Sequence, residues 1–562
     1  MAREIIRPGY FHDLNLSVSG GTSKGTFYLS ANYRKDEGVL KTNSFEKINT
    51  RLNAEFKPFG NLTVGSKMNL MYTRNNRVRN ESSAGGYASL ATNTLPWYPV
   101  YNQDGTYFNP KSRINPVAFL PQANYENHID VYRAIANVFA EINVVSVKGL
   151  ALRSELGVDA VQNNSLERIS ETVNLDPRSE AYDKATTYVS TNWNTFFKYY
   201  KSFAGEAHKI SSEMGIEGNK RGRYERYMEG QALRGDLPEF GNPQQIKDAN
   251  VNFKNEKSYI GYFGRLDYNL LNKYNAGVSF RYDGIGQFVP ENRWRLFKSA
   301  SLGWILSEEG FMLGIKPVVN FLKLWTSYGE TGNSNVPDRK LPSYATNNNL
   351  RYTGAATSTE ITMLANQDLK WEVNKAYDIG LDFGFYENKI NGSFAYFNQN
   401  LQDLVLDIKV SGSTGTAKTD YTINAGNMYN RGFEFNLTSV NVHLPQLRFK
   451  WATSFNVTYN KNKILGLSPS IDSEGAGKTD VGGSVHTITK KEVPLQAYYL
   501  PYYAGVDPAT GDEMIYEIDS ALFNQTGNTV LTGRIVPATS ANTQGNKYIL
   551  KTDLPSLSIL GE

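Results

Sequence analysis

The sequence predicts an all-β protein, a transmembrane antiparallel β-barrel, and three observations carry this prediction. Apolar and polar residues alternate with a period of two along many segments, which is typical of strands with one dry and one wet face. Aromatic residues make up 13% of the chain, with 36 Tyr, and 48 Gly favour turns. No run of about 18 or more apolar residues occurs, which excludes a transmembrane helix and is compatible with a membrane barrel.

The stretch SYIGYFGRLDYNLLNKYNAGVSFRYDG, residues 258–284, shows this alternation clearly. Its even positions are apolar or aromatic: Ile260, Tyr262, Leu266, Tyr268 and Leu270, then Tyr274, Ala276, Val278, Phe280 and Tyr282. The odd positions between them are largely polar. We interpret the segment as two strands joined by a tight turn at LNK.

The same reasoning predicts about 16 strands, many of them as long as the roughly 9–11 residues that a tilted strand needs to cross a bilayer. Their starts fall near residues 14, 26, 47, 62, 131, 150, 187, 206, 258, 274, 294, 320, 373, 391, 424 and 447.

The connections between these strands alternate in length, which is typical of outer-membrane barrels. Residues 1–460 are predicted to form the barrel, with long extracellular loops at about 74–130, 219–257 and 329–371. Residues 461–562 are predicted to be a long extracellular loop region and a truncated C-terminal end. A soluble β-sandwich array or a solenoid is the alternative, although no internal repeat of fixed period supports it.

Composition and motifs argue against several function classes. The net charge is only +4, which gives no reason to expect a nucleic-acid partner, and the absence of cysteine removes thiolate chemistry. Gly21 to Gly25 match G-x-S-x-G, but the serine lies between two strands, so we interpret it as a hairpin turn. The five histidines are scattered, and Gly505 to Glu513 lack the order of a calcium loop. We predict neither an enzyme nor a metal or cofactor site.

The stretch NTLPWYPVYNQDGTYFNP, within the first long loop, carries the candidate binding residues. Aromatic faces beside amides suit sugar rings or peptide side chains through stacking and hydrogen bonds. The candidates are Trp97, Tyr98, Tyr101, Tyr107 and Phe108. The alternative is that these side chains only pack the loop on itself.

Many motifs, in order along nearly the whole chain, resemble one family. They include LNLSVSGGTSKGTFYLSANYRKDEGVL, INPVAFL, the stretch at 258–284 with the following NRWRLFKSASLGWILSEEGFM, LKLWTSYGETGN, NQDLKWEVNKAYDIGLDFGFYENKINGSFAYFNQNLQDLVL, INAGNMYNRGFEFNL and YYAGVDPATGDEMIY. Together they resemble the SusC/RagA family of TonB-dependent outer-membrane transporters of Bacteroidota. The resemblance implies a multi-pass barrel in the outer membrane of a Gram-negative cell.

The chain also departs from the family pattern. Family barrels have 22 strands and a plug domain, whereas about 16 strands and no plug are recognisable in this sequence. An unclosed sheet would leave bare edges, which lipid does not tolerate. We therefore expect this chain to be the central piece of a split or truncated transporter.

The resemblance implies active import of oligosaccharides, or in some members of peptides, across the outer membrane. The implied partners are a SusD-like surface lipoprotein and the TonB–ExbB–ExbD system, which would act through a plug that is not in this chain. If the even face of 258–284 meets lipid, the lumen-facing residues are Arg265, Asp267, Arg281 and Asp283, and we expect a structural role for them. A surface glycan-binding adhesin and a nonfunctional remnant remain the alternatives.

Overall fold

The computed structural model describes residues 2–78, 94–95, 97–108, 115–173, 179–233, 243–333, 335–352, 356–410, 420–467, 487–526, 529–549 and 556–561. The chain divides into two compact units, and the division passes along three long strands. Unit 1 comprises Met1–Lys198 and Gly215–Ile260, and unit 2 comprises Tyr199–Met214 and Gly261–Glu562.

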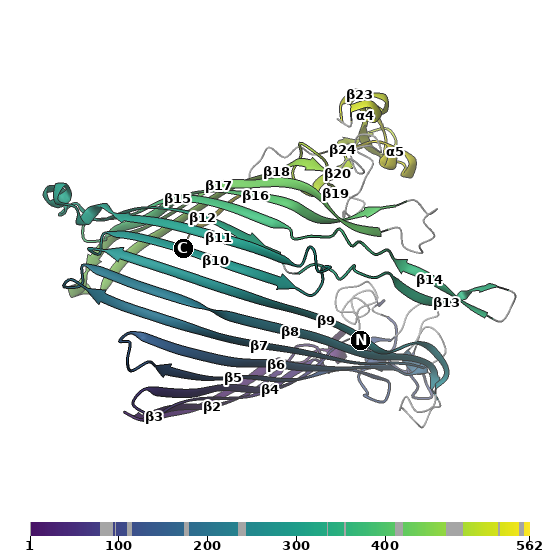
Figure 1. Cartoon of the computed structure of the whole chain (residues 1–562). Coiled ribbons are helices and arrows are strands. Elements are labelled where there is room, and N and C mark those ends of the chain that lie inside the picture. Colours follow the sequence, from purple (N-terminus) through teal and green to yellow (C-terminus); the bar gives the residue numbers. More distant parts are fainter. Residues whose placement is uncertain are drawn as a thin grey trace. The chain divides into compact units, whose positions relative to one another are not determined.

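Unit 1 is an antiparallel sheet in which each strand pairs with the next one along the chain. Figure 1 shows its strands as successive hairpins coloured from purple to teal. The strands are β1 (Tyr10–Thr22), β2 (Gly25–Glu37), β3 (Ser44–Phe59), β4 (Leu62–Asn76), β5 (Tyr125–Asn143), β6 (Leu150–Ile169), β7 (Glu180–Phe203), β8 (His208–Leu233) and β9 (Pro243–Leu270).

Unit 2 continues the same hairpin pattern from the last part of β9. Its sheet contains β10 (Tyr274–Ile285), β11 (Trp294–Ile305), β12 (Val319–Gly332), β15 (Val373–Phe385), β16 (Ile390–Lys409), β17 (Asp420–Leu444), β18 (Phe449–Leu467) and β25 (Ser556–Gly561). Every predicted strand start lies inside one of the observed strands or within two residues of its first residue, so the all-β prediction is confirmed.

Tight turns join the strands at one end, which we call the short-turn end. Thr22 pairs with Gly25 across a two-residue turn, so the G-x-S-x-G match is the predicted hairpin turn. The LNK turn is also confirmed, because Leu271 and Asn272 both have positive φ, at 54° and 58°. That conformation matches the twist of a hairpin, and the Asn269 side chain accepts a hydrogen bond from the Asn272 N–H at 3.1 Å.

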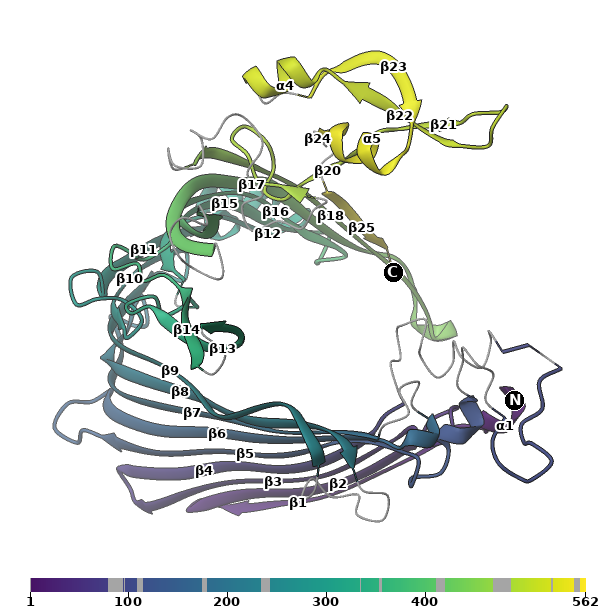
Figure 2. The same ribbon diagram turned by 90° about the vertical axis from the view of Figure 1, so that its right-hand side faces the viewer.

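The opposite end, which we call the long-loop end, carries the connections 77–124, 333–372 and 468–555. The predicted loop 219–257 was too long, because β8 continues to Leu233 and β9 begins at Pro243. The predicted loop 329–371 contains a separate hairpin of β13 (Ser343–Tyr352) and β14 (Ala356–Met363), labelled in Figures 1 and 2.

The C-terminal region is more ordered than a plain loop. It contains two small sheets and two short helices, which Figure 2 shows in yellow-green and yellow. One sheet is β19 (Thr487–Ile488), β20 (Ala497–Pro501) and β24 (Lys547–Ile549). The other is β21 (Tyr503–Val506), β22 (Glu513–Ile518) and β23 (Leu531–Pro537), and the helices are α4 (Ser520–Thr526) and α5 (Ser540–Gly545). Their side chains pack a small core around Ile488, Phe523 and Ile549.

Each main sheet has one apolar face and one polar face. On the apolar face of unit 2, Tyr282 stacks on Trp294 at 5.0 Å, and Tyr274 stacks on Trp304 at 6.3 Å. These two aromatic pairs lie about 8 residues apart on β10, with Val278 between them, which is about 26 Å along the strand or about 20 Å in height for a strand tilted by about 40°. Aromatic residues that flank an apolar band of about 25 Å are typical of barrel strands in a membrane. None of the helices in the described part of the chain is long and apolar enough to cross a membrane.

Candidate functional site

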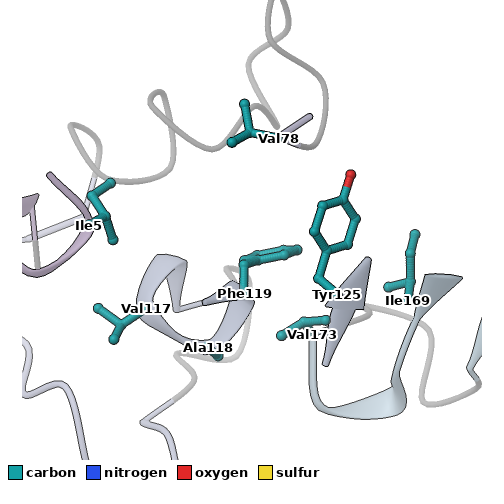
Figure 3. Close-up of a cluster of buried hydrophobic side chains, with 8 residues drawn as sticks. All are labelled: Ile5, Val78, Val117, Ala118, Phe119, Tyr125, Ile169 and Val173. Carbon is teal, nitrogen blue, oxygen red and sulfur yellow. The ribbon is translucent and has the colours of Figure 1, made fainter. Parts of the chain in front are cut away.

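A buried apolar cluster, which we call the loop core, underlies the long connection 77–124 of unit 1. It combines side chains from the N-terminal segment, from the connection itself, from β5 and β6 and from the 3-10 helix η2 (Glu171–Val173) that follows β6 (Figure 3). They are Ile5, Val78, Val117, Ala118, Phe119, Tyr125, Ile169 and Val173. Phe119 is 2% exposed and meets the Tyr125 ring edge-on at 5.4 Å. The loop core fixes the base of the connection, because its apolar side chains are removed from water.

A short 3-10 helix, η1 (Pro116–Phe119), supplies three residues of the loop core. Asn115 caps it, since the Asn115 side-chain oxygen accepts a hydrogen bond from the Val117 N–H at 3.0 Å, and Pro116 fits the first helical position. The Asn115 amide nitrogen also donates to the carbonyl oxygens of Val100 at 2.7 Å and Phe108 at 3.2 Å. One side chain therefore joins η1 to the segment that carries the predicted aromatic residues.

That segment is a small hairpin at residues 100–108, which we call the aromatic hairpin. The Phe108 N–H donates to the Val100 carbonyl at 3.1 Å, and the Asn102 N–H donates to the Thr106 carbonyl at 2.8 Å. Asp104 accepts hydrogen bonds from the hydroxyl and the N–H of Thr106, and these bonds lower the pKa of its carboxyl. Gly105 has a φ of +83°, which a residue without Cβ adopts without strain.

The five predicted aromatic residues divide into an anchored set and an exposed set. Tyr107 packs against the loop core, and burial raises the pKa of its hydroxyl. Phe108 and Tyr98 are half-buried against each other, with ring centroids 5.4 Å apart. Trp97 is 72% exposed and Tyr101 is 53% exposed. The packing alternative therefore holds for three of the rings, while ligand binding by the two outward rings stays a prediction.

The exposed rings offer flat apolar surfaces beside hydrogen-bonding groups. Trp97 meets the edge of Tyr98 at 6.3 Å, and Tyr101 leans on Tyr107 at 5.4 Å, so each exposed ring rests on an anchored one. Such rings present contact area at a low cost in conformational entropy. This arrangement can stack on a sugar ring or on an apolar peptide side chain.

The four predicted lumen residues lie together on the polar face of β9 and β10, in unit 2. They form two ion pairs within single strands: Arg265 Nε lies 2.6 Å from Asp267 Oδ2, and Arg281 Nη2 lies 3.0 Å from Asp283 Oδ1. Arg281 also lies 5.8 Å from the centre of the Phe263 ring. Each carboxylate has its own cation, as a structural role requires, while the side of the membrane that these residues face stays a prediction.

Sequence reasoning missed the anchoring residues of the loop. Asn115 and Phe119 come from INPVAFL, where an asparagine before a proline is a signal for a capped helical turn. The motif thus carried a signal for the start of η1 that sequence reasoning did not use, and no signal for the contacts that join η1 to the aromatic hairpin. Across the described ranges, no group of three or more His, Asp or Glu side chains is placed to hold a metal ion.

Comparison with known proteins agrees with the architecture. Residues 6–544 match the family model described as TonB dependent receptor-like, beta-barrel. TonB-dependent receptor P39 of Formosa agariphila is 26% identical over 481 residues, which cover 84% of the chain and 44% of that protein. TonB-dependent receptor SusC of Bacteroides thetaiotaomicron is 26% identical over 505 residues, which cover 84% of the chain and 49% of that protein. The chain thus spans about half the length of these curated relatives.

A solved structure of the RagAB peptide transporter superposes with a TM-score of 0.78 at 21% identity, covering 98% of the chain and 59% of its counterpart. At this identity the likeness shows a shared fold. The family match, in contrast, covers nearly the whole chain. The chain therefore belongs to the TonB-dependent receptor-like β-barrel family of the outer membrane, which confirms the resemblance in its motifs.

Proposed function

We propose that this chain forms barrel wall and ligand-contacting loops in a TonB-dependent importer of oligosaccharides or peptides. The observation that carries the proposal is the family match over residues 6–544. Two similar proteins indicate the two substrate classes: one is named SusC, and the other is a peptide transporter. The proposal assigns binding and passage to the chain, and no bond-breaking step.

In this proposal the apolar sheet faces meet lipid and the polar faces line the lumen. The long-loop end then lies outside the cell, where the aromatic hairpin first meets the substrate. Trp97 and Tyr101 would stack on it, while Tyr98, Tyr107 and Phe108 hold the hairpin in place. Arg265, Asp267, Arg281 and Asp283 would face the lumen as paired wall charges.

The proposed partners follow from the same relatives. A SusD-like surface lipoprotein would cover the long-loop end, and the TonB–ExbB–ExbD system would supply energy through a plug domain. These partners belong to the whole transporter, of which the chain corresponds to about half by length.

The test is uptake of labelled oligosaccharide and peptide pools by cells that express the gene in its native context. We expect the double variant Trp97→Ala/Tyr101→Ala to lower uptake at limiting substrate by about tenfold, equivalent to about 1.4 kcal/mol of lost stacking. Phe311→Ala is the matched control, because Phe311 is 69% exposed and lies in η4 (Gly310–Ile315) at the short-turn end.

Dissipation of the proton gradient separates import from surface binding. If the protein is an importer, uptake of the labelled substrate should stop when the gradient is dissipated, while binding at the cell surface should persist. Binding that never leads to energy-dependent uptake would contradict the proposal and favour a surface adhesin. Equal loss in the Phe311→Ala control would show that the aromatic hairpin has no special role.

A further inference from the structure

A cavity in unit 1 lies beside the loop core, at the long-loop ends of β2 to β5. It has a volume of about 530 Å³, and its polar lining includes Arg7, Glu37, Arg74, Asn76, Gln122 and Glu126. Tyr125 of the loop core also borders the cavity, but none of these six polar residues belongs to the sites described above. The cavity is thus a candidate for a different ligand.

The parity of the strands places part of its lining on the apolar face of the sheet. Along β4, Leu70, Tyr72, Arg74 and Asn76 alternate with residues of the other face. In the β4–β5 register, Tyr72 lies opposite Tyr132 and Arg74 lies opposite Asp130. Leu70 is 46% exposed and Tyr132 is 50% exposed, as expected for a lipid-facing surface without its lipid.

The height of Arg74 above the Tyr72–Tyr132 pair corresponds to the headgroup layer of the membrane. Tyr72 and Tyr132 lie with ring centroids 5.0 Å apart, at the end of the apolar stretch. Arg74 and Asn76 follow two and four residues later, or about 5 and 10 Å higher for a strand tilted by about 40°. Polar headgroups occupy a layer about 5–7 Å thick beyond the hydrocarbon. Arg74 therefore lies at headgroup level, and Asn76 lies just beyond that layer.

The chemistry of the lining suits a phosphorylated sugar. Glu37 is occupied by Arg7 and by Lys35 at 3.1 Å, and Glu126 lies 3.6 Å from Arg168 Nη2. The side chain of Arg74 is 40% exposed, and its Nε lies 3.6 Å from Asp130, beyond the length of a charge-assisted hydrogen bond. A guanidinium in this state can donate to a phosphate, in the bidentate geometry that arginine favours.

The remaining polar groups complete the site. Asn76 donates to the Ser44 hydroxyl at 2.8 Å, and Gln122 donates to Glu126 at 2.8 Å. Amides and hydroxyls held in this way can exchange hydrogen bonds with sugar hydroxyls. We propose that this cavity binds the phosphorylated sugar headgroup of an outer-leaflet glycolipid, with Arg74 on the phosphate. The inference rests on the assignment of the apolar face to lipid that is made under the proposed function.

The experiment measures glycolipid binding to the protein purified from outer membranes in detergent. The probes are phosphorylated lipid A, dephosphorylated lipid A, phosphatidylglycerol and inorganic phosphate. We expect the unmodified protein to bind phosphorylated lipid A. Arg74→Gln should lower the affinity about tenfold, and Arg74→Lys should restore part of it, because lysine keeps the positive charge but lacks the planar, bidentate guanidinium group. We expect dephosphorylated lipid A, phosphatidylglycerol and inorganic phosphate to bind weakly.

Arg51→Gln is the matched control, because Arg51 is exposed and lies on the polar face of β3, opposite in parity to Ile48. Equal losses in Arg51→Gln and Arg74→Gln, or no loss in Arg74→Gln, would overturn the proposal. So would equal binding of phosphatidylglycerol or inorganic phosphate, which would indicate a general anion site. Substrate uptake by Arg74→Gln cells should be unchanged, so failure of this inference is distinguishable from failure of the import function.

Discussion

Two charged groups, one on the polar face of each unit, are paired in different ways. In unit 1, Glu141 of β5 accepts from Arg153 of β6 at 3.0 Å and from Lys198 of β7 at 2.6 Å, so one carboxylate joins three strands. In unit 2, Arg265 and Arg281 each pair with an aspartate two residues along the same strand. The first arrangement crosses the sheet, and the second follows a single strand.

The two kinds of ion pair differ in their effect on strand register. A contact between strands is lost when the register slips, so the Glu141 group favours one register over its alternatives. A contact within one strand survives any slip and leaves the register unaffected. Glu141 and Arg153 are also more buried, with side chains 16% and 23% exposed, whereas Arg265 is 63% exposed. We therefore expect the cross-strand group to matter more for stability.

Glu141→Gln should have the largest effect. It removes the shared anion and leaves Arg153 and Lys198 without their common partner, which we expect to cost about 2 kcal/mol, between the values for exposed and fully buried pairs. Chemical unfolding of the purified protein in detergent would measure the loss.

Asp267→Asn is the control for this experiment, because it removes a carboxylate of the same polar-face type from a same-strand pair. It should change the free energy of unfolding by less than about 0.5 kcal/mol. Equal losses in the two variants would break the distinction between cross-strand and same-strand pairs.

Glu309 extends the comparison to the short-turn end. Its carboxylate accepts from the Tyr274 hydroxyl at 2.7 Å, from the Trp304 indole at 3.1 Å and from Lys273 at 3.4 Å. These bonds, with that from Tyr274 foremost, lower the pKa of Glu309 below its ordinary value of 4.5. A lowered folded-state pKa means that the stabilisation is present above about pH 4.5 and disappears as the pH falls through the folded-state value.

We expect the melting temperature of the unmodified protein to exceed that of Glu309→Gln at pH 7. The gap should be smaller than that for Glu141→Gln, since Glu309 has one cationic donor, Lys273 at 3.4 Å, whereas Glu141 has two at 3.0 and 2.6 Å. It should close as the pH falls below 4.5. A gap that widens in acid would contradict the assigned direction of the pKa shift.

Exchange of the two charges in one same-strand pair should have the smallest effect. In Arg265→Asp/Asp267→Arg the pair is rebuilt in the opposite order, so the free energy of unfolding should stay within about 0.5 kcal/mol of the original. A much larger change would mean that another part of the transporter contacts the two charges in their original order. A parallel uptake assay would detect such a contact.

Most of the fold could be predicted because lipid and water impose a strict alternation on each strand. The prediction failed where that constraint ends. The sequence NKRGRYERYMEGQ at 219–231 is polar at both parities, so it was interpreted as a loop, although β8 continues through it. The hairpin of β13 and β14 was missed for a similar reason, since the run of Asn347 to Asn349 hides any alternation.

The candidate site could be predicted only as a set of residue types. The aromatic composition of the stretch at 97–108 identified the candidate residues. Which of their rings are exposed depends on Asn115 and on the loop core, which gathers side chains from four parts of the sequence. The cavity lined by Arg7, Arg74 and Glu126 gave no sequence signal, because these residues are far apart in the chain.

Asn115 has a consequence for how such a receptor can diversify. Its amide holds the back of the aromatic hairpin through main-chain carbonyls, and those acceptors are the same whatever side chains the hairpin carries. Tyr101 in the hairpin is therefore open to substitution at little cost to the loop beneath it, and so is Trp97, which precedes the hairpin and is 72% exposed. A lineage could acquire a new nutrient by exchanging two outward rings while inheriting the scaffold unchanged.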